Sequence, residues 1–255
     1  MLRDCWADDL RDDLPGRTIA DIGRLGKFLV VRLDGDGDRY LTLHLGMTGQ
    51  ILVAPHAAAV RGGAAPAVEV QPHTRFVFIL RRPDGDTVRL EFRDMRKFGR
   101  VHFTAGGPAP RLLGLGPDAW IGGWNARYLE DRLRGRKAPI KAFLLDQRNL
   151  AGIGNIYADE TLWWAQIAPI RPGGSLSTGE VERLSIEIRA QLAEGVRRLG
   201  CTLADFVDIE GRAGSFQEQL EAYGRQGQRC SRCGETLIRV IVAGRGTAYC
   251  PGCQH

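Results

Sequence analysis

The sequence has no long apolar run. No stretch of its 255 residues is long and apolar enough to span a bilayer. The opening residues 1–9 carry acidic groups where a secretory signal needs a basic start followed by an apolar segment. No internal repeat is visible. These absences favour a cytoplasmic protein that does not use a membrane.

Cysteine is scarce, and its spacing argues against a disulfide framework. Four of the six cysteines fall in Cys230-Ser-Arg-Cys233 and Cys250-Pro-Gly-Cys253. The short gap lets both thiolates of a pair reach one ion, and the 16 residues between the pairs are enough for a hairpin that returns the second pair. We therefore expect one structural Zn²⁺ held by four thiolates, with two disulfides or free thiols as the alternative. Cys5 and Cys201 remain and fit small buried side chains.

The charge excess is small. A formal net charge of +5 and a sequence pI of about 9.0 favour a polyanionic partner. So small an excess can attract such a partner only where the positive side chains are clustered. The segment Asp94-Met-Arg-Lys-Phe-Gly-Arg100 places three cations around one aromatic ring. Such interleaving suits neutralisation of a nucleic-acid backbone combined with base stacking or wedging. An edge strand with a solvated charged face explains the segment equally well.

The first part of the sequence is rich in strand signals. From about Thr18 to Phe103, short β-branched or aromatic runs are separated by turns such as Asp34-Gly35 and Asp84-Gly85. This pattern predicts an antiparallel sandwich or barrel, with a loop at the Ala/Gly-rich segment Ala57–Ala67. The predicted strands include Phe28–Leu33, Tyr40–Leu45, Arg75–Leu80 and Val88–Phe92.

The second part changes character. A Gly- and Pro-rich stretch, Gly106–Gly123, predicts a linker, and helical periodicity follows from about Asn125 to Tyr223. Residues 224–255 predict a small module with strands at Thr236–Val242 and Thr247–Tyr249, joined by a four-residue turn that contains Arg245. On a tip fixed by metal, this arginine suits a phosphate contact.

A Gly-rich turn lies within the helical part. Gly152-Ile-Gly-Asn155 lacks the third glycine and the preceding strand of a dinucleotide-binding fingerprint. We expect a helix, a tight turn and a second helix, with Asn155 as the cap. The amides at such a helix start can bind phosphate, although a Gly-rich cap by itself is more often only a cap.

Taken in order, these segments resemble the bacterial formamidopyrimidine-DNA glycosylase family, over nearly the whole sequence. The tail is more similar to the formamidopyrimidine branch than to the endonuclease VIII branch. The matching motifs are Leu43-His-Leu-Gly-Met-Thr-Gly49, Asp94-Met-Arg-Lys-Phe-Gly99, Leu115-Gly-Pro-Asp118, Gly152-Ile-Gly-Asn-Ile-Tyr-Ala158 and the four cysteines.

The resemblance implies an α+β multidomain fold. It has an N-terminal antiparallel β-sandwich at 1–110, a helix-two-turns-helix DNA-binding domain at 111–223 and a β-hairpin zinc finger at 224–255. It also implies a monomer in the bacterial cytoplasm, associated with the nucleoid. Duplex DNA with an oxidised base or an abasic site would bind in the cleft between domains.

The same resemblance implies the activity and the site. Such enzymes are DNA glycosylases and abasic-site lyases of base-excision repair that flip oxidised purines, 8-oxoguanine or formamidopyrimidines, out of the duplex. Lys27 matches a phosphate-contacting lysine that assists β-elimination, and Arg245 matches a phosphate contact assigned to δ-elimination. The remaining matches imply wedge residues Met47, Arg96 and Phe98, the phosphate contact Asn155, and less closely aligned DNA or lesion contacts His73, Arg136 and Lys141.

The family's nucleophile has no counterpart in this sequence. In the family, an N-terminal proline forms a Schiff base with the sugar, and the following glutamate acts as acid and base. Met1 aligns roughly thirty residues inside the family pattern, so the first helix and strand are also missing. We expect a truncated or misplaced start and a normal glycosylase/lyase.

Three alternatives to this enzyme stay open. One is a damaged-DNA-binding relative that is inactive or lyase-impaired. A second is a residual lyase that uses Lys27 or the Met1 amine. The third is a zinc-ribbon protein of translation or transcription, which explains the cysteines but not Met47, Arg96 and Phe98.

Overall fold

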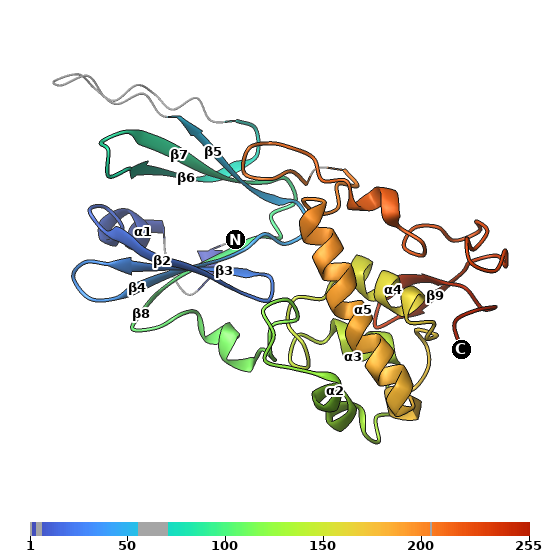
Figure 1. Ribbon diagram of the computed structural model, residues 1–255. Helices are drawn as coiled ribbons and strands as arrows, with labels where there is room; N and C mark the ends of the chain where they lie inside the picture. The colour runs from blue at the N-terminus through green and yellow to red at the C-terminus, as the bar shows by residue number, and fades with distance from the viewer. Residues whose placement is uncertain (1, 4–6, 56–70, 205) are drawn as a thin grey trace. The chain divides into compact units, whose positions relative to one another are not determined.

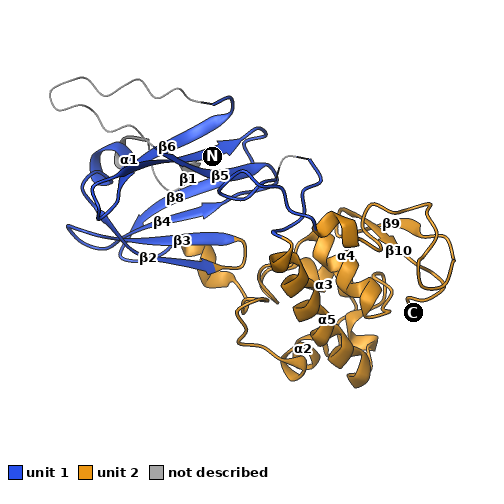
Figure 2. Ribbon diagram, turned by 45° about the horizontal axis from the view of Figure 1, so that its top comes forward, with its two compact units in different colours: residues 1–24, 28–109, 199–215 blue, residues 25–27, 110–198, 216–255 orange. Residues whose placement is uncertain are grey.

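The structure is a computed structural model, and it describes residues 2–3, 7–55, 71–204 and 206–255 (Figure 1). The chain divides into two compact units (Figure 2). The loop expected at Ala57–Ala67 and the residue Cys5 lie outside the described residues. Unit 1 comprises residues 1–24, 28–109 and 199–215, and unit 2 comprises residues 25–27, 110–198 and 216–255.

Unit 1 contains two β-sheets. The strands pair antiparallel, except that the short β1 runs parallel to β8. The first sheet has the order β1 (Leu2–Arg3), β8 (Arg100–Ala105), β4 (Arg39–His44), β3 (Phe28–Asp34) and β2 (Thr18–Leu25). The second has the order β5 (Gly49–Pro55), β7 (Thr87–Asp94) and β6 (Thr74–Arg81), and the helix α1 (Ala7–Asp13) precedes β2.

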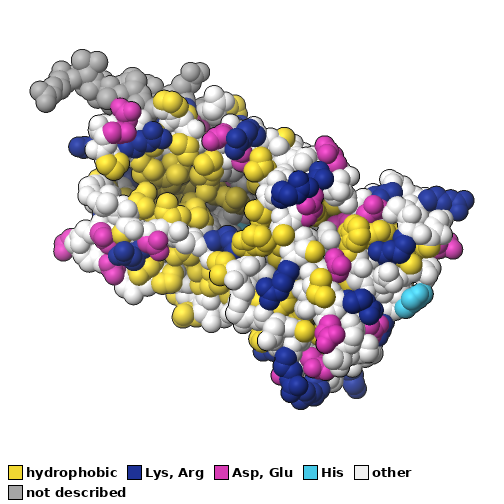
Figure 3. Space-filling view, viewed as in Figure 1, with side chains coloured by type: hydrophobic (Ala, Val, Ile, Leu, Met, Phe, Trp, Pro, Cys, Tyr) yellow, Lys and Arg dark blue, Asp and Glu magenta, His cyan; other side chains and the backbone are white. Residues whose placement is uncertain are grey.

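The two sheets share one apolar core, because side chains of both sheets pack in a single cluster. Val31, Leu41 and Phe103 of the first sheet pack in one cluster with Phe92 of the second. Figure 3 shows hydrophobic side chains gathered in a hollow between the sheets of this unit. The predicted antiparallel sandwich is confirmed.

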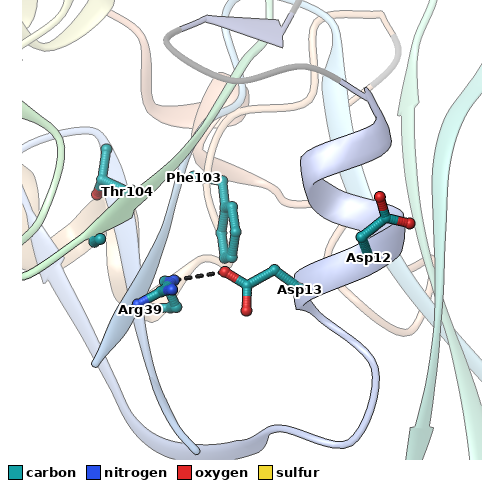
Figure 4. A pocket seen from close by; sticks show the side chains of 6 residues that line it. Asp12, Asp13, Arg39, Phe103 and Thr104 are labelled. Carbon is teal, nitrogen blue, oxygen red and sulfur yellow. Dashed lines mark hydrogen bonds and ion pairs between the residues drawn. The ribbon is translucent and has the colours of Figure 1, made fainter. Parts of the chain in front are cut away.

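A cavity of about 330 Å³ opens beside α1 (Figure 4). Asp13 of α1 accepts a hydrogen bond from the Arg39 Nε of β4 at 2.6 Å and is also paired with Arg17. These guanidinium groups hold the pKa of Asp13 below its usual value. The cavity is lined by Asp12, Asp13, Arg39, Phe103, Thr104 and Ala105, so none of the predicted site residues faces it.

Unit 2 is helical. Its core is a cluster that includes Leu129, Phe143, Leu162 and Ile188 from the four α-helices. The helices are α2 (Ala126–Leu133), α3 (Ile140–Leu145), α4 (Asn155–Trp164) and α5 (Thr178–Arg197), with 3₁₀ turns η1 (Pro110–Gly114), η2 (Gly173–Ser175) and η3 (Phe216–Gln219).

Local sequence sets the ends of these helices. The Asn125 side chain caps α2, and Ser177 with Glu180 forms a capping box on α5. The expectation of helix as far as Tyr223 was wrong. Leu199 and Gly200 both take positive φ, which ends the helix directly after α5.

The C-terminal module is a hairpin of β9 (Ile238–Val242) and β10 (Arg245–Tyr249). Its turn is the pair Ala243-Gly244, with φ of 49° and 70°, so it has the primed geometry that matches strand twist. The turn is therefore shorter than the four residues expected, and Arg245 is the first residue of β10. Among the described residues, no helix has the length and apolar character needed to cross a membrane.

Candidate nucleic-acid interface

The four paired cysteines converge at the base of this hairpin. Their sulfur atoms all lie within 4.8 Å of one another, with Cys233 and Cys250 3.3 Å apart and Cys230 and Cys253 3.8 Å apart. Tetrahedral Zn²⁺ with Zn–S bonds of about 2.3 Å requires sulfur separations of about 3.8 Å. Both separations are too long for a disulfide, whose S–S bond is about 2.0 Å. The donor set fits one structural Zn²⁺, as the spacing predicted.

The zinc module is attached to α4 through Trp163. The Arg232 guanidinium lies 3.8 Å from the centre of the indole ring, and its Nη1 donates to the Trp163 carbonyl at 3.0 Å. Trp163 also packs in one buried cluster with Cys230 and Leu237. A cation–π contact and an apolar cluster therefore fix the metal site against the helix.

A candidate anion site, defined by Lys27, Asn155 and Arg245, lies where α4 begins. The helix starts at Asn155, and its N-cap Gly154 provides no side-chain hydrogen bond. The expectation that Asn155 caps the helix was therefore wrong. Its Nδ2 instead donates to the Gly246 carbonyl at 3.2 Å, which ties the helix start to the hairpin. The amides of the first turn keep the partial positive charge that attracts anions.

Lys27 lies in the turn between β2 and β3, in the segment Leu25–Lys27 that is grouped with unit 2. The Gly26 amide donates to the Asp118 carboxylate at 2.6 Å and fixes this turn. The Lys27 Nζ would lie only 3.5 Å from a Cβ on Gly154, so the glycine leaves room for the ammonium. Although Lys27 keeps contact with solvent, desolvation and the positive charge of Arg245 lower its pKa to about 8. The arginine itself is exposed at the start of β10.

Lys141 lies inside unit 2. Its side chain has no exposed surface and pairs with Asp159 of α4 at 2.6 Å. Its Nζ also donates to the Thr247 hydroxyl at 2.7 Å and to the Gly246 carbonyl at 3.3 Å. Burial lowers the pKa of Lys141 and raises that of Asp159 to about 6, and the attraction between the two opposes both shifts. A direct DNA contact by Lys141 stays a prediction.

Arg136 is half-buried and already engaged within unit 2. Its Nε donates to the Arg132 carbonyl at 2.8 Å, its Nη2 donates to the Asn149 Oδ1 at 3.3 Å, and its guanidinium lies over the Phe143 ring. These contacts explain its position without a ligand. Its role as a DNA contact is likewise still a prediction.

The wedge group, Met47, Arg96 and Phe98, projects from two loops of unit 1. Met47 is 63% exposed and Phe98 is 53% exposed, although both are large apolar residues. The Arg96 guanidinium lies 5.3 Å from the centre of the Phe98 ring. Exposed apolar side chains beside a cation suit insertion between bases next to a phosphate backbone.

Asp94 links the two loops that carry the wedge group. This buried carboxylate accepts the Thr48 hydroxyl at 2.6 Å and the Gly99 amide at 2.7 Å. The Thr48 Oγ1 in turn accepts the Arg96 amide at 3.3 Å. Sequence reasoning did not single out Asp94 or Thr48, although both stand inside the quoted motifs.

His73 lines a small cavity together with Asp94. Its φ of 66° is unusual for a residue other than glycine, and its carbonyl accepts the Asp94 amide at 3.0 Å. The cavity of about 90 Å³ is lined by Thr48, Gln50, His73, Arg93, Asp94 and Met95. The structure thus places His73 beside the support of the wedge group.

Comparison with known families covers most of the chain. Residues 1–101 match the formamidopyrimidine-DNA glycosylase N-terminal domain, residues 115–206 match the formamidopyrimidine-DNA glycosylase H2TH domain, and residues 227–255 match the zinc finger found in FPG and IleRS. The chain is 42% identical to the formamidopyrimidine-DNA glycosylase of Chloroflexus aggregans, over 94% of this chain and 82% of that protein. It belongs to the formamidopyrimidine-DNA glycosylase family. This family membership rules out the alternative of a zinc-ribbon protein of translation or transcription.

Solved structures agree with this assignment. MutM (FPG) from Thermus thermophilus has a TM-score of 0.78 and 40% identity, covering 94% of this chain and 84% of that one. The Lactococcus lactis Fpg bound to abasic-site DNA has a TM-score of 0.81 and 30% identity, covering 97% and 86%. The sandwich, the helical domain and the hairpin zinc finger are therefore the family fold.

Proposed function

We propose that this protein is a base-excision-repair DNA glycosylase and abasic-site lyase that acts on oxidised purines, 8-oxoguanine and formamidopyrimidines, in duplex DNA. The observation that carries the proposal is the convergence of Lys27, Asn155 and Arg245 at the start of α4. The Lactococcus lactis relatives were solved with abasic-site DNA and with DNA containing Fapy-dG, which supports this substrate class. On this proposal the protein works as a monomer on chromosomal DNA.

The anion site would hold the phosphates around the lesion. Arg245 offers a planar, permanently charged donor fork, and the uncapped amides of α4 add a second set of donors. Asn155 lies in the first turn of α4 and donates a hydrogen bond to the hairpin backbone. It would therefore hold the amides of α4 and the Arg245 guanidinium in fixed positions relative to each other. Together these groups would fix the strand while one nucleotide leaves the stack.

The wedge group would occupy the space that the flipped base vacates. Met47 and Phe98 are apolar and exposed, so inserting them between base pairs would also remove them from water. Arg96 would pair with the orphaned base or its phosphate. Enzymes of this kind must extrude the base because its reactive atoms are inaccessible inside a duplex.

Lys27 would take part in the elimination step. With a pKa of about 8, about a tenth of Lys27 is neutral at pH 7, and the neutral amine can accept a proton from the sugar. Arg245 stays protonated and would stabilise the departing phosphate. The structural Zn²⁺ has four thiolate ligands and no open position, so its part is to hold the hairpin.

Borohydride trapping tests the proposal. The protein is incubated with duplexes that carry 8-oxoguanine or an abasic site, and with an undamaged duplex of the same sequence. We expect a covalent adduct with both damaged duplexes, and mass spectrometry would identify the amine that forms it. Lesion-selective binding without any adduct would reject the lyase assignment and favour a damaged-DNA-binding relative.

A further inference from the structure

We propose that Thr247 is a positioning residue, held by the buried Lys141–Asp159 pair, that sets Arg245 against the start of α4. The inference rests on the proposed function, because it concerns the same anion site. In this inference, Asp159, Lys141 and Thr247 together position Arg245, and they do so independently of zinc binding.

The Lys141 ammonium is the centre of the arrangement. It forms an ion pair with Asp159 Oδ1 at 2.6 Å and donates hydrogen bonds to Thr247 Oγ1 at 2.7 Å and to the Gly246 carbonyl at 3.3 Å. Lys141 and Asp159 come from α3 and α4, whereas Thr247 and Gly246 belong to β10. A buried charge held by one ion pair and two hydrogen bonds fixes β10 relative to both helices.

Thr247 passes this restraint to the arginine. Its hydroxyl accepts from Lys141 and donates to the Arg245 carbonyl at 3.2 Å, so its donor and its acceptor functions are both used. Thr247 is only 1% exposed and contributes no surface to a ligand. Its hydroxyl therefore acts on the arginine backbone rather than on DNA.

The restraint also reaches Asn155. The Gly246 carbonyl accepts hydrogen bonds from both Lys141 and Asn155, at 3.3 Å and 3.2 Å. A shift of this carbonyl would disturb the Asn155 amide and the arginine together. The buried pair thus controls two of the three residues of the anion site.

The zinc ligands lie at the end of the hairpin away from its turn. The nearest metal ligand, Cys250, lies at the base, whereas Arg245 stands at the opposite end of β10 beside a two-residue turn. Two-stranded hairpins are marginally stable without further packing. The structure therefore assigns the base to zinc and the tip to the Lys141–Asp159 pair.

A double-mutant cycle tests the inference. Thr247→Val keeps the shape but removes the hydroxyl, and Thr247→Ser keeps the hydroxyl. Affinity for a duplex with a tetrahydrofuran abasic analogue is measured in the wild-type and Arg245→Ala backgrounds, alongside zinc content and melting temperature. We expect Thr247→Val to weaken binding about fivefold to tenfold, with zinc retained and with little further loss in the Arg245→Ala background. Thr247→Ser should restore most of the affinity.

Losses that add fully in the double variant, or an unchanged affinity of folded Thr247→Val, would overturn the inference. If Thr247→Val does not fold, Asp159→Asn is carried through the same cycle and judged by the same two results. An Arg245→Ala variant with wild-type affinity would instead reject the anion site on which the proposed function rests. The two failures are therefore distinguishable.

Discussion

The Thr48 hydroxyl donates to the Asp94 carboxylate at 2.6 Å, and this bond joins the loop that carries Met47 to the loop that carries Arg96 and Phe98. The carboxylate is fully buried, and its second oxygen accepts the Gly99 amide. A wedge that enters a base stack needs a rigid base, because ordering loops on binding costs affinity. On the proposed function, the pair would supply that rigidity before DNA binds.

Removing the Thr48 hydroxyl tests this role. Thr48→Val deprives a buried carboxylate of one partner and the Arg96 amide of an acceptor. We expect a loss of about 1–3 kcal/mol in the free energy of unfolding, measured by urea denaturation. Thr48→Ser is the matched control and should lose far less. Equal stability of the valine and serine variants would contradict the role.

A close backbone approach also shapes the wedge group. Gly46 has φ of 68°, and a Cβ there would lie 2.7 Å from the Phe98 carbonyl carbon. Gly106 has a similar φ of 72° but open space around its Cβ position. We expect Gly46→Ala to destabilise the protein by roughly 2 kcal/mol more than Gly106→Ala. Similar melting temperatures for the two variants would show that the loops separate easily.

The zinc site makes a different prediction. Cys250→Ser replaces one thiolate by a weak ligand, so we expect loss of bound zinc and weaker DNA binding, because the hairpin base would loosen. Metal analysis and anisotropy titration on the same sample check both. Wild-type affinity in a metal-free Cys250→Ser sample would sink the idea that zinc supports the interface.

The lowered pKa of Lys27 predicts that DNA affinity depends on pH. Phosphate favours the charged ammonium, and the Lys27 pKa of about 8 means that this charge is lost as pH rises through that value. DNA affinity should therefore decrease between pH 7 and pH 9. The decrease should exceed the one caused by the change in the net charge of the rest of the protein. Lys27→Arg keeps its charge over this range, so it should flatten the decrease. A parallel decrease in both proteins would assign the titration to another group.

The sequence predicted those parts of the molecule whose chemistry is local. The sandwich followed from strand patterns, and the zinc ligands followed from their spacing. The hydrogen bond between Thr48 and Asp94 could not be predicted, because it joins residues far apart along the chain. Asp159 gave no signal either, since an acidic residue on a helix is usually solvated. Asn155 was expected to cap α4 because asparagine favours that position, but its amide bonds the hairpin instead.

The most direct test compares the affinity for a duplex containing a tetrahydrofuran abasic analogue with that for an intact duplex of the same sequence, at one stated salt concentration. We expect tighter binding of the damaged duplex. Arg96→Ala should reduce mainly this preference, whereas Arg245→Ala should weaken binding to both duplexes and lower the salt slope by about one unit. Equal affinity of the wild-type protein for the two duplexes would contradict the proposed recognition of damaged DNA.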